Sequence, residues 1–232
     1  MKKKVLMSWS SGKDSAWALY QLQNDPEIEM AGLFSTLNKE FNRVAMHGVR
    51  KELLEKQAES IGLPLEIINL PFPCSNIEYE KIMAEFVKES KAKGVDHFAF
   101  GDLFLEDVRN YRVEKLKDTG IKPIFPIWGE CTKSLSKLMI ESGLKTVITC
   151  IDPKKLSKEF VGQEFTQEFL AKLPNEVDPC GEKGEFHSFV FDGPIFKEKI
   201  DIIQGEIVER DGFVFSDILL KTRRPVAGET IE

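Results

Sequence analysis

The sequence predicts an α/β fold, a doubly wound and mostly parallel sheet followed by a small C-terminal α+β subdomain. Short apolar runs alternate with helix-like segments up to about residue 152, which is typical of right-handed βαβ units. After that point strand-like runs follow one another, and Asp211-Gly212 between the last two is a strong hairpin signal. We therefore expect a first domain at 1–152 and a second at 153–232.

The first domain begins with Lys4–Ser8, a short apolar run typical of a buried parallel strand. Ser15–Gln23 has helical spacing and stops at Asn24-Asp25-Pro26. Further strands are expected at Glu27–Ser35, Leu65–Leu70 and His97–Phe100, with helices at Gly48–Ile61 and Asn76–Lys93. Val108–Lys117, Ser134–Ser142 and Lys145–Cys150 continue the alternation.

The second domain begins with a helical stretch at Gln163–Leu173. A segment rich in proline and glycine, Pro174–Gly184, follows it. Strand-like runs then occupy Glu185–Phe191, Ile200–Arg210 and Phe213–Leu220. This order predicts a small sheet rather than another βαβ unit.

Composition excludes several classes of protein. With 232 residues, 42% hydrophobic and 30% charged, the chain has the composition of a globular protein with a sizeable core. A net charge of −6 disfavours a nucleic-acid partner, which usually meets a basic face. The four cysteines are far apart and form no C-x-x-C pair, so neither a zinc knuckle nor a redox dithiol is expected.

The expected compartment is the cytoplasm. No apolar run approaches the roughly 20 residues of a membrane-spanning helix, so no membrane partner is expected. The lysines at 2–4 precede an apolar run that is too short for a signal peptide, and no small-residue cleavage site follows.

The most informative motif is Ser10–Ser15 (SSGKDS), which directly follows the first strand and begins the first helix. A helix N-terminus presents unpaired N–H groups and the positive end of the helix dipole, so it binds anions. The serine hydroxyls can donate to phosphate oxygens, and Gly12 lets the backbone approach closely. Lys13 adds a positive charge, while Asp14 either orients the loop or helps to hold Mg²⁺.

The hexapeptide is not a Walker A loop. That motif needs a glycine where Met7 stands and a serine or threonine where Asp14 stands. Instead it resembles the PP-loop, S-G-G-x-D-S, of the adenine nucleotide alpha hydrolase superfamily, whose members cleave ATP between the α- and β-phosphates. Ser11 departs from this pattern, because it replaces the first glycine. A serine-rich helix cap without a ligand is the alternative, and the strand–loop–helix context disfavours it.

Three further segments extend the resemblance over nearly the whole chain. They are Met46–Ala58 (MHGVRKELLEKQA), Phe100–Glu114 (FGDLFLEDVRNYRVE) and Glu176–Val190 (EVDPCGEKGEFHSFV). Together with the loop they resemble the diphthine–ammonia ligase family of PP-loop ATPases, in its bacterial-type branch. The resemblance implies a Rossmann-like sheet of the HUP type. It also implies ATP and Mg²⁺ as ligands.

The resemblance assigns nucleotide-binding residues along the first domain. They are Ser8, Ser10, Ser11, Gly12, Lys13, Asp14, Ser15, His47, Gly101, Asp102, Arg109 and Arg112, with Asp14 as the metal ligand. On their own terms, Asp102 is equally a turn aspartate, and the two arginines share one helix face that solvent and nearby glutamates would also suit. His47 would bind ATP or cap the following helix. If the first and fourth strands are neighbours, Gly101 and Asp102 lie beside the PP-loop.

A dense group of acidic residues precedes the strand at Glu185–Phe191. Asp178, Glu182 and Glu185 stand with His187 in a segment that also holds Pro179, Gly181 and Gly184, which favours a shaped loop. Such a cluster could bind Mg²⁺, an ammonium ion or the acceptor group of a substrate. An acidic surface turn is the alternative. The resemblance favours a site and makes Glu182, Glu185 and His187 catalytic candidates together with Lys13 and Asp14.

The resemblance implies an amide-forming ligase. A substrate carboxylate would attack the α-phosphate of ATP, pyrophosphate would leave, and ammonium would supply the nitrogen that displaces AMP. The acceptor would be protein-bound diphthine or, in the bacterial-type branch, a small metabolite. A PP-loop enzyme that modifies tRNA or another metabolite and a non-catalytic ATP sensor are the alternatives. A homodimer is also expected, because subdomains of this size often pair.

Overall fold

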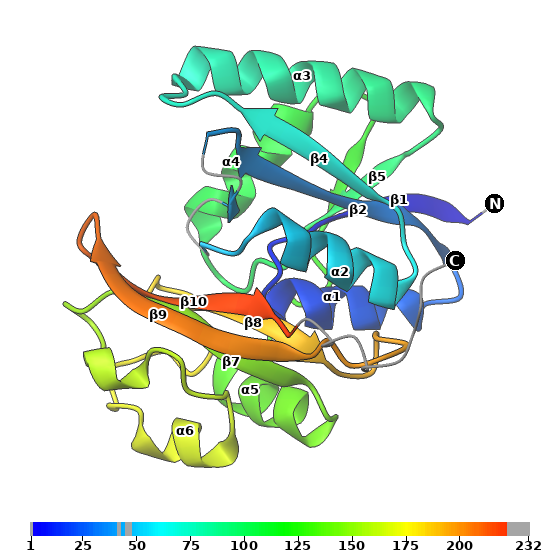
Figure 1. The fold of residues 1–232 in the computed structure, drawn as a ribbon. Coiled ribbons are helices and arrows are strands. Elements are labelled where there is room, and N and C mark those ends of the chain that lie inside the picture. The colour runs from blue at the N-terminus through cyan, green and yellow to red at the C-terminus, as the bar shows by residue number, and fades with distance from the viewer. Residues whose placement is uncertain (1, 41–42, 45–47, 222–232) are drawn as a thin grey trace, which may run out of the picture.

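The computed structural model describes residues 2–40, 43–44 and 48–221 and contains two sheets (Figure 1). The first sheet contains β1 (Lys3–Ser8), β2 (Ile28–Asn38), β3 (Arg43–Val44), β4 (Leu65–Leu70), β5 (His97–Ala99) and β6 (Lys122–Ile124). Its parallel strands have the order β4-β2-β1-β5-β6, and the short β3 pairs antiparallel with the end of β2. Strand order therefore reverses between β1 and β5.

The second sheet is antiparallel and has the order β8-β7-β10-β9. Its strands are β7 (Lys145–Ile151), β8 (Phe186–Asp192), β9 (Ile202–Arg210) and β10 (Phe213–Leu220). The β9–β10 turn has left-handed backbone at Asp211 (φ 54°) and Gly212 (φ 82°), which matches the twist of a two-residue hairpin. The hairpin expected from Asp211-Gly212 is thus present.

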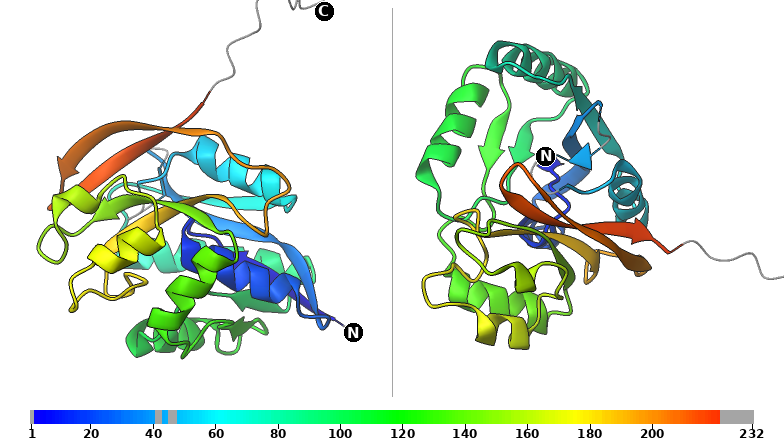
Figure 2. Two further views of the ribbon diagram at one scale, coloured as in Figure 1. Left: turned by 90° about the horizontal axis from the view of Figure 1, so that it is seen from below. Right: turned by 60° about the vertical axis from the view of Figure 1, so that its left-hand side comes forward.

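Helices cover both sheets in layers (Figure 1, Figure 2). The helices are α1 (Lys13–Gln23), α2 (Lys51–Ile61), α3 (Asn76–Ala92), α4 (Glu106–Leu116), α5 (Thr132–Glu141) and α6 (Gln167–Lys172), with a 3₁₀ turn at Lys158–Phe160. α3 and α4 pack on the outer face of the first sheet, α1 and α2 lie between the two sheets, and α6 lies beyond the second.

The central core joins the two parts of the chain. Val5 and Met7 of β1, Leu19 of α1, and Phe189 of β8 are all fully buried in one apolar cluster. β1 is apolar throughout its middle because helices cover both faces of the sheet, as its sequence predicts. The second sheet therefore packs directly against the helix that begins at the PP-loop.

The predicted fold class, a parallel-dominated α/β sheet with a small C-terminal sheet, is confirmed. Some element bounds differ for local reasons. The helix expected from Gly48 begins at Lys51, because Gly48 has a left-handed φ of 66°. The helix expected from Gln163 begins at Gln167, because the Thr166 side chain accepts a hydrogen bond from Phe169 N and caps it. β7 lies in the second sheet although it precedes residue 152, and the division into domains at 152 stays a prediction.

Candidate active site

The PP-loop lies at the carboxyl ends of β1 and β5, where strand order reverses. Open α/β sheets bind ligands at this kind of position. Gly101, directly beyond β5, packs against the loop: a Cβ there would stand 2.9 Å from both the carbonyl carbon of Asp14 and the amide nitrogen of Ser15. Only glycine fits this approach. Gly101 and Asp102 therefore lie beside the loop, where the strand argument expects them.

Hydrogen bonds between serines shape the start of α1. The Ser10 and Ser15 hydroxyls are 3.0 Å apart, and Ser15 Oγ donates to the Gly12 carbonyl at 2.9 Å. Gly12 occupies the N-cap position, and its residue type supplies no side-chain cap. Lys13 N, the first N–H of α1, donates to Ser188 Oγ at 3.3 Å, and the N-cap residue itself supplies no capping side chain, which suits an anion at this helix end.

Ser11 adopts a left-handed backbone with φ 70°, at the position where the superfamily pattern has glycine. Its carbonyl accepts hydrogen bonds from Gln57 Nε2 of α2 and from Val190 N of β8, both at 3.0 Å. Trp9 Nε1 donates to Gln57 Oε1 at 2.8 Å and orients that amide. Within the described residues, the buried Ser11 Oγ has no hydrogen-bond partner. The loop keeps a left-handed backbone at Ser11, despite the side chain, because hydrogen bonds from α2 and β8 hold the Ser11 carbonyl.

We expect Ser11→Gly to raise the free energy of unfolding by about 0.5–1 kcal/mol, because glycine adopts this φ without the steric cost that serine incurs. Ser11→Ala is the matched control, since it removes the hydroxyl but keeps the Cβ and its strain. Urea unfolding of the three chains measures the difference. A Ser11→Gly chain less stable than Ser11→Ala would contradict the assignment of strain to this residue.

Lys13 is buried, with 2% of its side chain exposed. Its Nζ lies 2.8 and 3.0 Å from the two carboxylate oxygens of Asp14 and donates to the Cys180 carbonyl. It also stands over the rings of Phe186 and Phe165, at 5.3 and 5.7 Å from their centroids. Burial acts to lower the pKa of Lys13, but Asp14 outweighs it and the pKa is raised. Lys13 is therefore a cation held between the PP-loop and the segment that contains Cys180.

Asp178 organises the acidic segment. Its carboxylate accepts from Thr132 Oγ1 at 2.7 Å, from Cys180 N at 2.9 Å and from Glu182 N at 3.3 Å. Its own N–H donates to Glu185 Oε1 at 3.0 Å. The segment is thus a shaped loop with internal hydrogen bonds, as its glycines and proline predict, and not a loose surface turn.

Glu182 connects the acidic segment to the first domain. Its Oε1 accepts a hydrogen bond from Leu103 N at 2.9 Å, directly after Asp102. Burial raises the pKa of Glu182 to about 7, and the nearby Asp14 and Asp102 carboxylates raise it further against the opposing effects of the Leu103 N–H and Lys13. A carboxyl group with this pKa can both accept and release a proton at neutral pH.

His187 and Glu185 lie deeper in the second domain. Burial lowers the pKa of His187 to about 4, and Lys13 and Lys155 lower it further, so the imidazole is neutral at pH 7. Glu185 is 3% exposed, and its Oε2 has no hydrogen-bond partner among the described residues. Because Lys13 is a nearby cation, protonation of the His187 imidazole would place two positive charges close together.

Asp102 and Arg112 form a two-point ion pair, with Nε to Oδ2 at 2.6 Å and Nη2 to Oδ1 at 3.1 Å. Arg112 also stacks on the Phe100 ring at 4.2 Å, which fixes the guanidinium. Arg109 stands over Trp128 at 4.8 Å. The two arginines share a face of α4, as their spacing predicts. Arg112 is paired with Asp102, while the exposed Arg109 lies over the Trp128 ring.

The structure therefore brings most of the predicted residues to one edge of the first sheet. Ser8 ends β1, and the loop, Gly101, Asp102 and Glu182 follow at the same edge. His47 lies outside the described residues. Sequence reasoning missed Gln57 and Thr132, which hold the loop and the acidic segment through their side chains. The available signal for the first of them was a polar residue on the apolar stripe of the predicted helix, since Gln57 lies four residues from both Leu53 and Ile61.

The chemistry of the loop fits ATP. An α1 N-terminus with glycine at its N-cap, the buried Ser11 hydroxyl without a partner among the described residues, and Gly101, where a Cβ would clash with the loop, form a cradle for a phosphate chain. Mg²⁺ is usually held by one or two carboxylates and by substrate phosphates, which Asp14 and ATP would supply. Within the described residues, no group of three or more His, Cys, Asp or Glu side chains is arranged to hold a metal alone.

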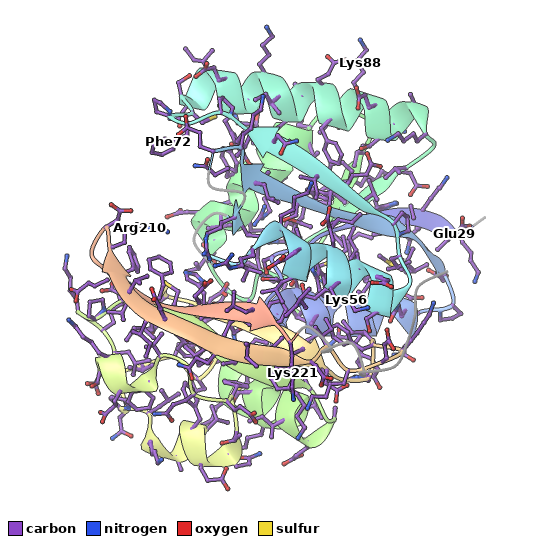
Figure 3. All side chains as sticks on the ribbon, viewed as in Figure 1. Glu29, Lys56, Phe72, Lys88, Arg210 and Lys221 are labelled. Atoms are coloured by element: carbon purple, nitrogen blue, oxygen red, sulfur yellow. The ribbon has the colours of Figure 1, made fainter. Side chains whose placement is uncertain are left out.

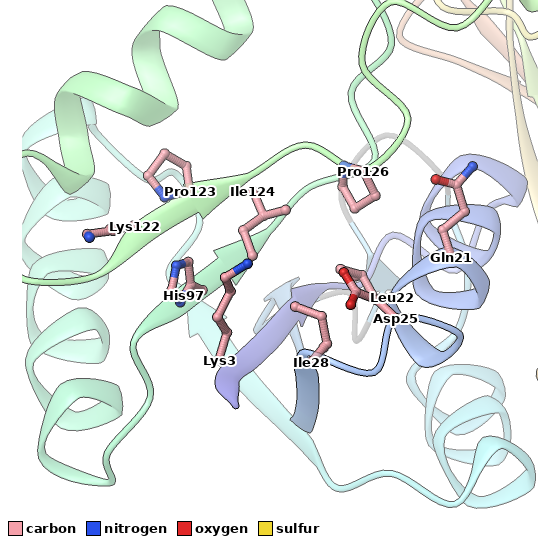
Figure 4. Close-up of a pocket in the computed structure, with 10 residues that line it drawn as sticks. All are labelled: Lys3, Gln21, Leu22, Asp25, Ile28, His97, Lys122, Pro123, Ile124 and Pro126. Atoms are coloured by element: carbon pink, nitrogen blue, oxygen red, sulfur yellow. The ribbon is translucent and has the colours of Figure 1, made fainter. Parts of the chain in front are cut away.

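A cavity of about 360 Å³ lies elsewhere, at the amino ends of the strands (Figure 4). Lys3, His97 and Lys122, at the first residues of β1, β5 and β6, line it together with the end of α1. His97 Nδ1 lies 2.6 Å from Asp96 Oδ1, so its side chain already has a partner within the protein. Because ligands of such sheets bind at the carboxyl ends of the strands, this cavity is not the candidate active site.

The sheet order and the strand–loop–helix at its carboxyl edge define a Rossmann-like α/β protein with a PP-loop-type sequence. The diphthamide synthase N-terminal domain model matches residues 1–123, and the C-terminal domain model matches residues 131–220. The chain belongs to the diphthamide synthase family. The family expected from the motifs is confirmed, and its bacterial-type branch stays a prediction.

Curated relatives agree with this assignment. A mouse diphthine–ammonia ligase is 27% identical over 236 residues, which cover 90% of this chain and 86% of the mouse protein. The human diphthine–ammonia ligase is 25% identical over 235 residues, with the same coverage. The fission yeast ligase of that name is 27% identical over 89% of this chain, which spans only 37% of the yeast protein. The expectation of a ligase-like enzyme is confirmed at the level of this family.

Among the described residues, no helix has the length and apolar character to cross a membrane.

Proposed function

We propose that the protein is an ATP-dependent amide-forming ligase that adenylates a substrate carboxylate and transfers ammonia to it. The contact between Glu182 and Leu103 carries the proposal, because it places a carboxyl group with a pKa of about 7 beside the PP-loop. A general base of this kind is what the second step needs, since ammonium must lose a proton before its nitrogen can attack. The names of the relatives support the reaction class.

In the proposed first step, an oxygen of the substrate carboxylate attacks the α-phosphorus of ATP, and the bond to the β-phosphate oxygen breaks. Pyrophosphate would leave with its charge balanced by Lys13 and by the N–H groups at the start of α1, and Mg²⁺, if held by Asp14, would supply further positive charge there. Lys13 Nζ contacts Asp14 and the Cys180 carbonyl in this structure. Its role would therefore be to contribute positive charge to the loop from the buried side.

In the second step, Glu182 takes a proton from ammonium, and the nitrogen attacks the acyl carbon. The bond from that carbon to the AMP oxygen would break, and AMP would leave with the second proton that the nitrogen gives up as the amide forms. Glu185 and His187 would shape the acceptor pocket, with the neutral imidazole avoiding repulsion of the cationic ammonium. Asp102, held by Arg112, would keep its charge beside Glu182 and the nucleotide.

We propose that residues 1–152 bind ATP and residues 153–232 bind the acceptor. The relatives are named for diphthine, and protein-bound diphthine or a small metabolite with a carboxylate is the proposed acceptor. A cytoplasmic location would supply both ATP and ammonium.

The test is incubation of the full chain with Mg·ATP, ammonium and a pooled carboxylate extract labelled with ¹⁸O. Adenylation predicts AMP and pyrophosphate, with ¹⁸O from the carboxylate recovered in AMP. We expect Asp14→Ala to reduce AMP formation by at least about 100-fold, because it removes the carboxylate that holds Lys13 and contributes to metal binding. Glu29→Ala, on the exposed side of β2, is the control. Formation of ADP and phosphate, or unlabelled AMP, would overturn the mechanism.

A further inference from the structure

Three arginines from distant parts of the sequence line one cavity beside β3, the start of α2 and the β9–β10 hairpin. Arg43 lies in β3, Arg50 directly precedes α2, and Arg210 ends β9. The cavity has a volume of about 220 Å³, against roughly 30 Å³ for a water molecule in the liquid. Its other lining residues are Gly48, Glu206, Val208, Phe215, Ser216 and Asp217.

One carboxylate fixes two of the arginines. Arg43 Nη1 lies 2.8 Å from Asp217 Oδ1, and Arg50 Nη2 lies 2.6 Å from Asp217 Oδ2. Burial acts to raise the pKa of Asp217, but hydrogen bonds from Arg50 and Arg43 outweigh it and the pKa is lowered. Asp217 is therefore ionised. Arg43, Arg50 and Asp217 together carry one net positive charge.

Arg210 supplies the third guanidinium from the hairpin. Its carbon Cζ stands 5.2 Å from the centroid of the Phe215 ring, which orients it. Phe215 is in turn packed against Gly48, where a Cβ would come within 3.0 Å of Phe215 Cδ1. The lining side chains thus include three guanidinium groups and two carboxylates, Asp217 and Glu206, and the exposed Asp211 carboxylate lies 3.6 Å from Arg210 Nε at the rim.

We propose that this cavity binds an oxyanion group, a phosphate or a carboxylate of a small ligand. Guanidinium groups match the planar or tetrahedral oxygen pairs of such groups with two N–H donors each. Val208 and Phe215 offer an apolar wall for the carbon atoms that carry the anion. No residue of the PP-loop lines this cavity, and Gln57, which contacts Ser11, stands about two helical turns along α2 from Arg50.

An oxyanion site also explains the arginine in the Met46–Ala58 motif. The helix α2 begins at Lys51 and does not itself require an arginine at the preceding position. The guanidinium pair Arg43–Arg50 belongs to the first domain, and Arg210 and Asp217 belong to the hairpin of the second. A bound oxyanion would therefore connect the two sheets. This inference does not depend on the ligase activity.

Calorimetric titration of the full chain tests the proposal. The chain is first saturated with Mg²⁺ and α,β-methylene-ATP, and then titrated with inorganic phosphate and, separately, with succinate. We expect millimolar or tighter binding of one of these anions. Arg210→Gln should weaken that binding about tenfold, the loss of one charge-assisted interaction. Glu206→Gln should tighten it two- to threefold, because it removes a negative charge from the lining.

Lys88→Gln is the matched control, since it makes the same charge change on α3, away from the hairpin that carries Arg210 (Figure 3). It should leave the affinity unchanged. Tighter binding of phosphate would assign a phosphate ester as the ligand, and tighter binding of succinate would assign a carboxylate. The proposal is overturned if neither anion binds, if binding disappears when the nucleotide analogue is present, or if Arg210→Gln and Lys88→Gln bind equally well.

Discussion

Lys13→Met is expected to lower the free energy of unfolding by about 2–3 kcal/mol and kcat by at least about 100-fold. The methionine keeps the packing against Phe165 and Phe186 but removes the cation that faces Asp14 and the Cys180 carbonyl. Removing one partner of a buried ion pair typically costs 3–5 kcal/mol. The smaller value is expected here because a quarter of the Asp14 side chain is exposed.

The pH dependence of this loss has a definite sign. Burial raises the pKa of Asp14, and Lys13 opposes that rise. Without Lys13 the pKa rises further, so the carboxyl group becomes protonated more readily as pH falls and the buried negative charge disappears. The variant should therefore lose less stability at pH 5 than at pH 8, as chemical denaturation at the two pH values would measure.

A double-mutant cycle separates the ion pair from simple packing. Asp14→Asn alone leaves Lys13 charged, and Lys13→Met combined with Asp14→Asn removes both charges. The double variant should be more stable than Lys13→Met alone at pH 8, because no unpaired carboxylate remains. Additive losses in the cycle would show that Lys13 stabilises the loop through contacts other than Asp14.

The first sheet could be predicted because its signals are local. The apolar run of β1, the serine-rich loop and the spacing of α1 and α2 specify a βαβ unit without reference to other parts of the chain. Gly101 could be placed as well, because the expected pairing of β1 and β5 brings the ends of both strands together. The strand β3 has two residues, and β6 has the sequence KPI with a proline at its centre, so both carry too little apolar pattern to be recognised.

The way the second domain meets the loop could not be predicted. Nothing within Lys145–Ile151 distinguishes a parallel strand from an antiparallel one, since a strand buried on both faces is apolar in either case. The contacts of Lys13 with Cys180 and of Leu103 with Glu182 join residues far apart in the sequence, so no local pattern encodes them. The acidic segment was recognised by composition, whereas its position against Lys13 is a consequence of tertiary packing.

The second large effect is expected for Glu182→Gln, which should stabilise the fold at pH 8 while lowering kcat by about 100-fold or more. The folded-state pKa of Glu182 is about 7, above its ordinary value of 4.5, because burial disfavours the carboxylate. Glu182 therefore makes its full contribution to stability below pH 4.5, and that contribution is lost as pH rises from 4.5 through about 7. Glutamine has no charge to bury and still accepts the hydrogen bond from Leu103 N.

The rise in pKa corresponds to about 3 kcal/mol at 1.36 kcal/mol per pH unit, and we expect about 1–2 kcal/mol because solvent partly reaches the side chain. Unfolding measurements at pH 4 and pH 8 should show this gain only at the higher pH. Glu176→Gln, an exposed carboxylate in the same segment, should change neither stability nor kcat.

The loss of activity in Glu182→Gln should depend on the nucleophile. If Glu182 removes a proton from ammonium, hydroxylamine should restore much of the rate, because it is largely neutral at neutral pH and needs no base. At constant ammonium, the wild-type rate should rise as pH passes 7, because Glu182 becomes ionised, and the variant should lack that rise. A variant that hydroxylamine does not rescue, or one that keeps the wild-type pH profile, would assign Glu182 to positioning the Leu103 backbone and leave the base to be found among the other groups at this edge.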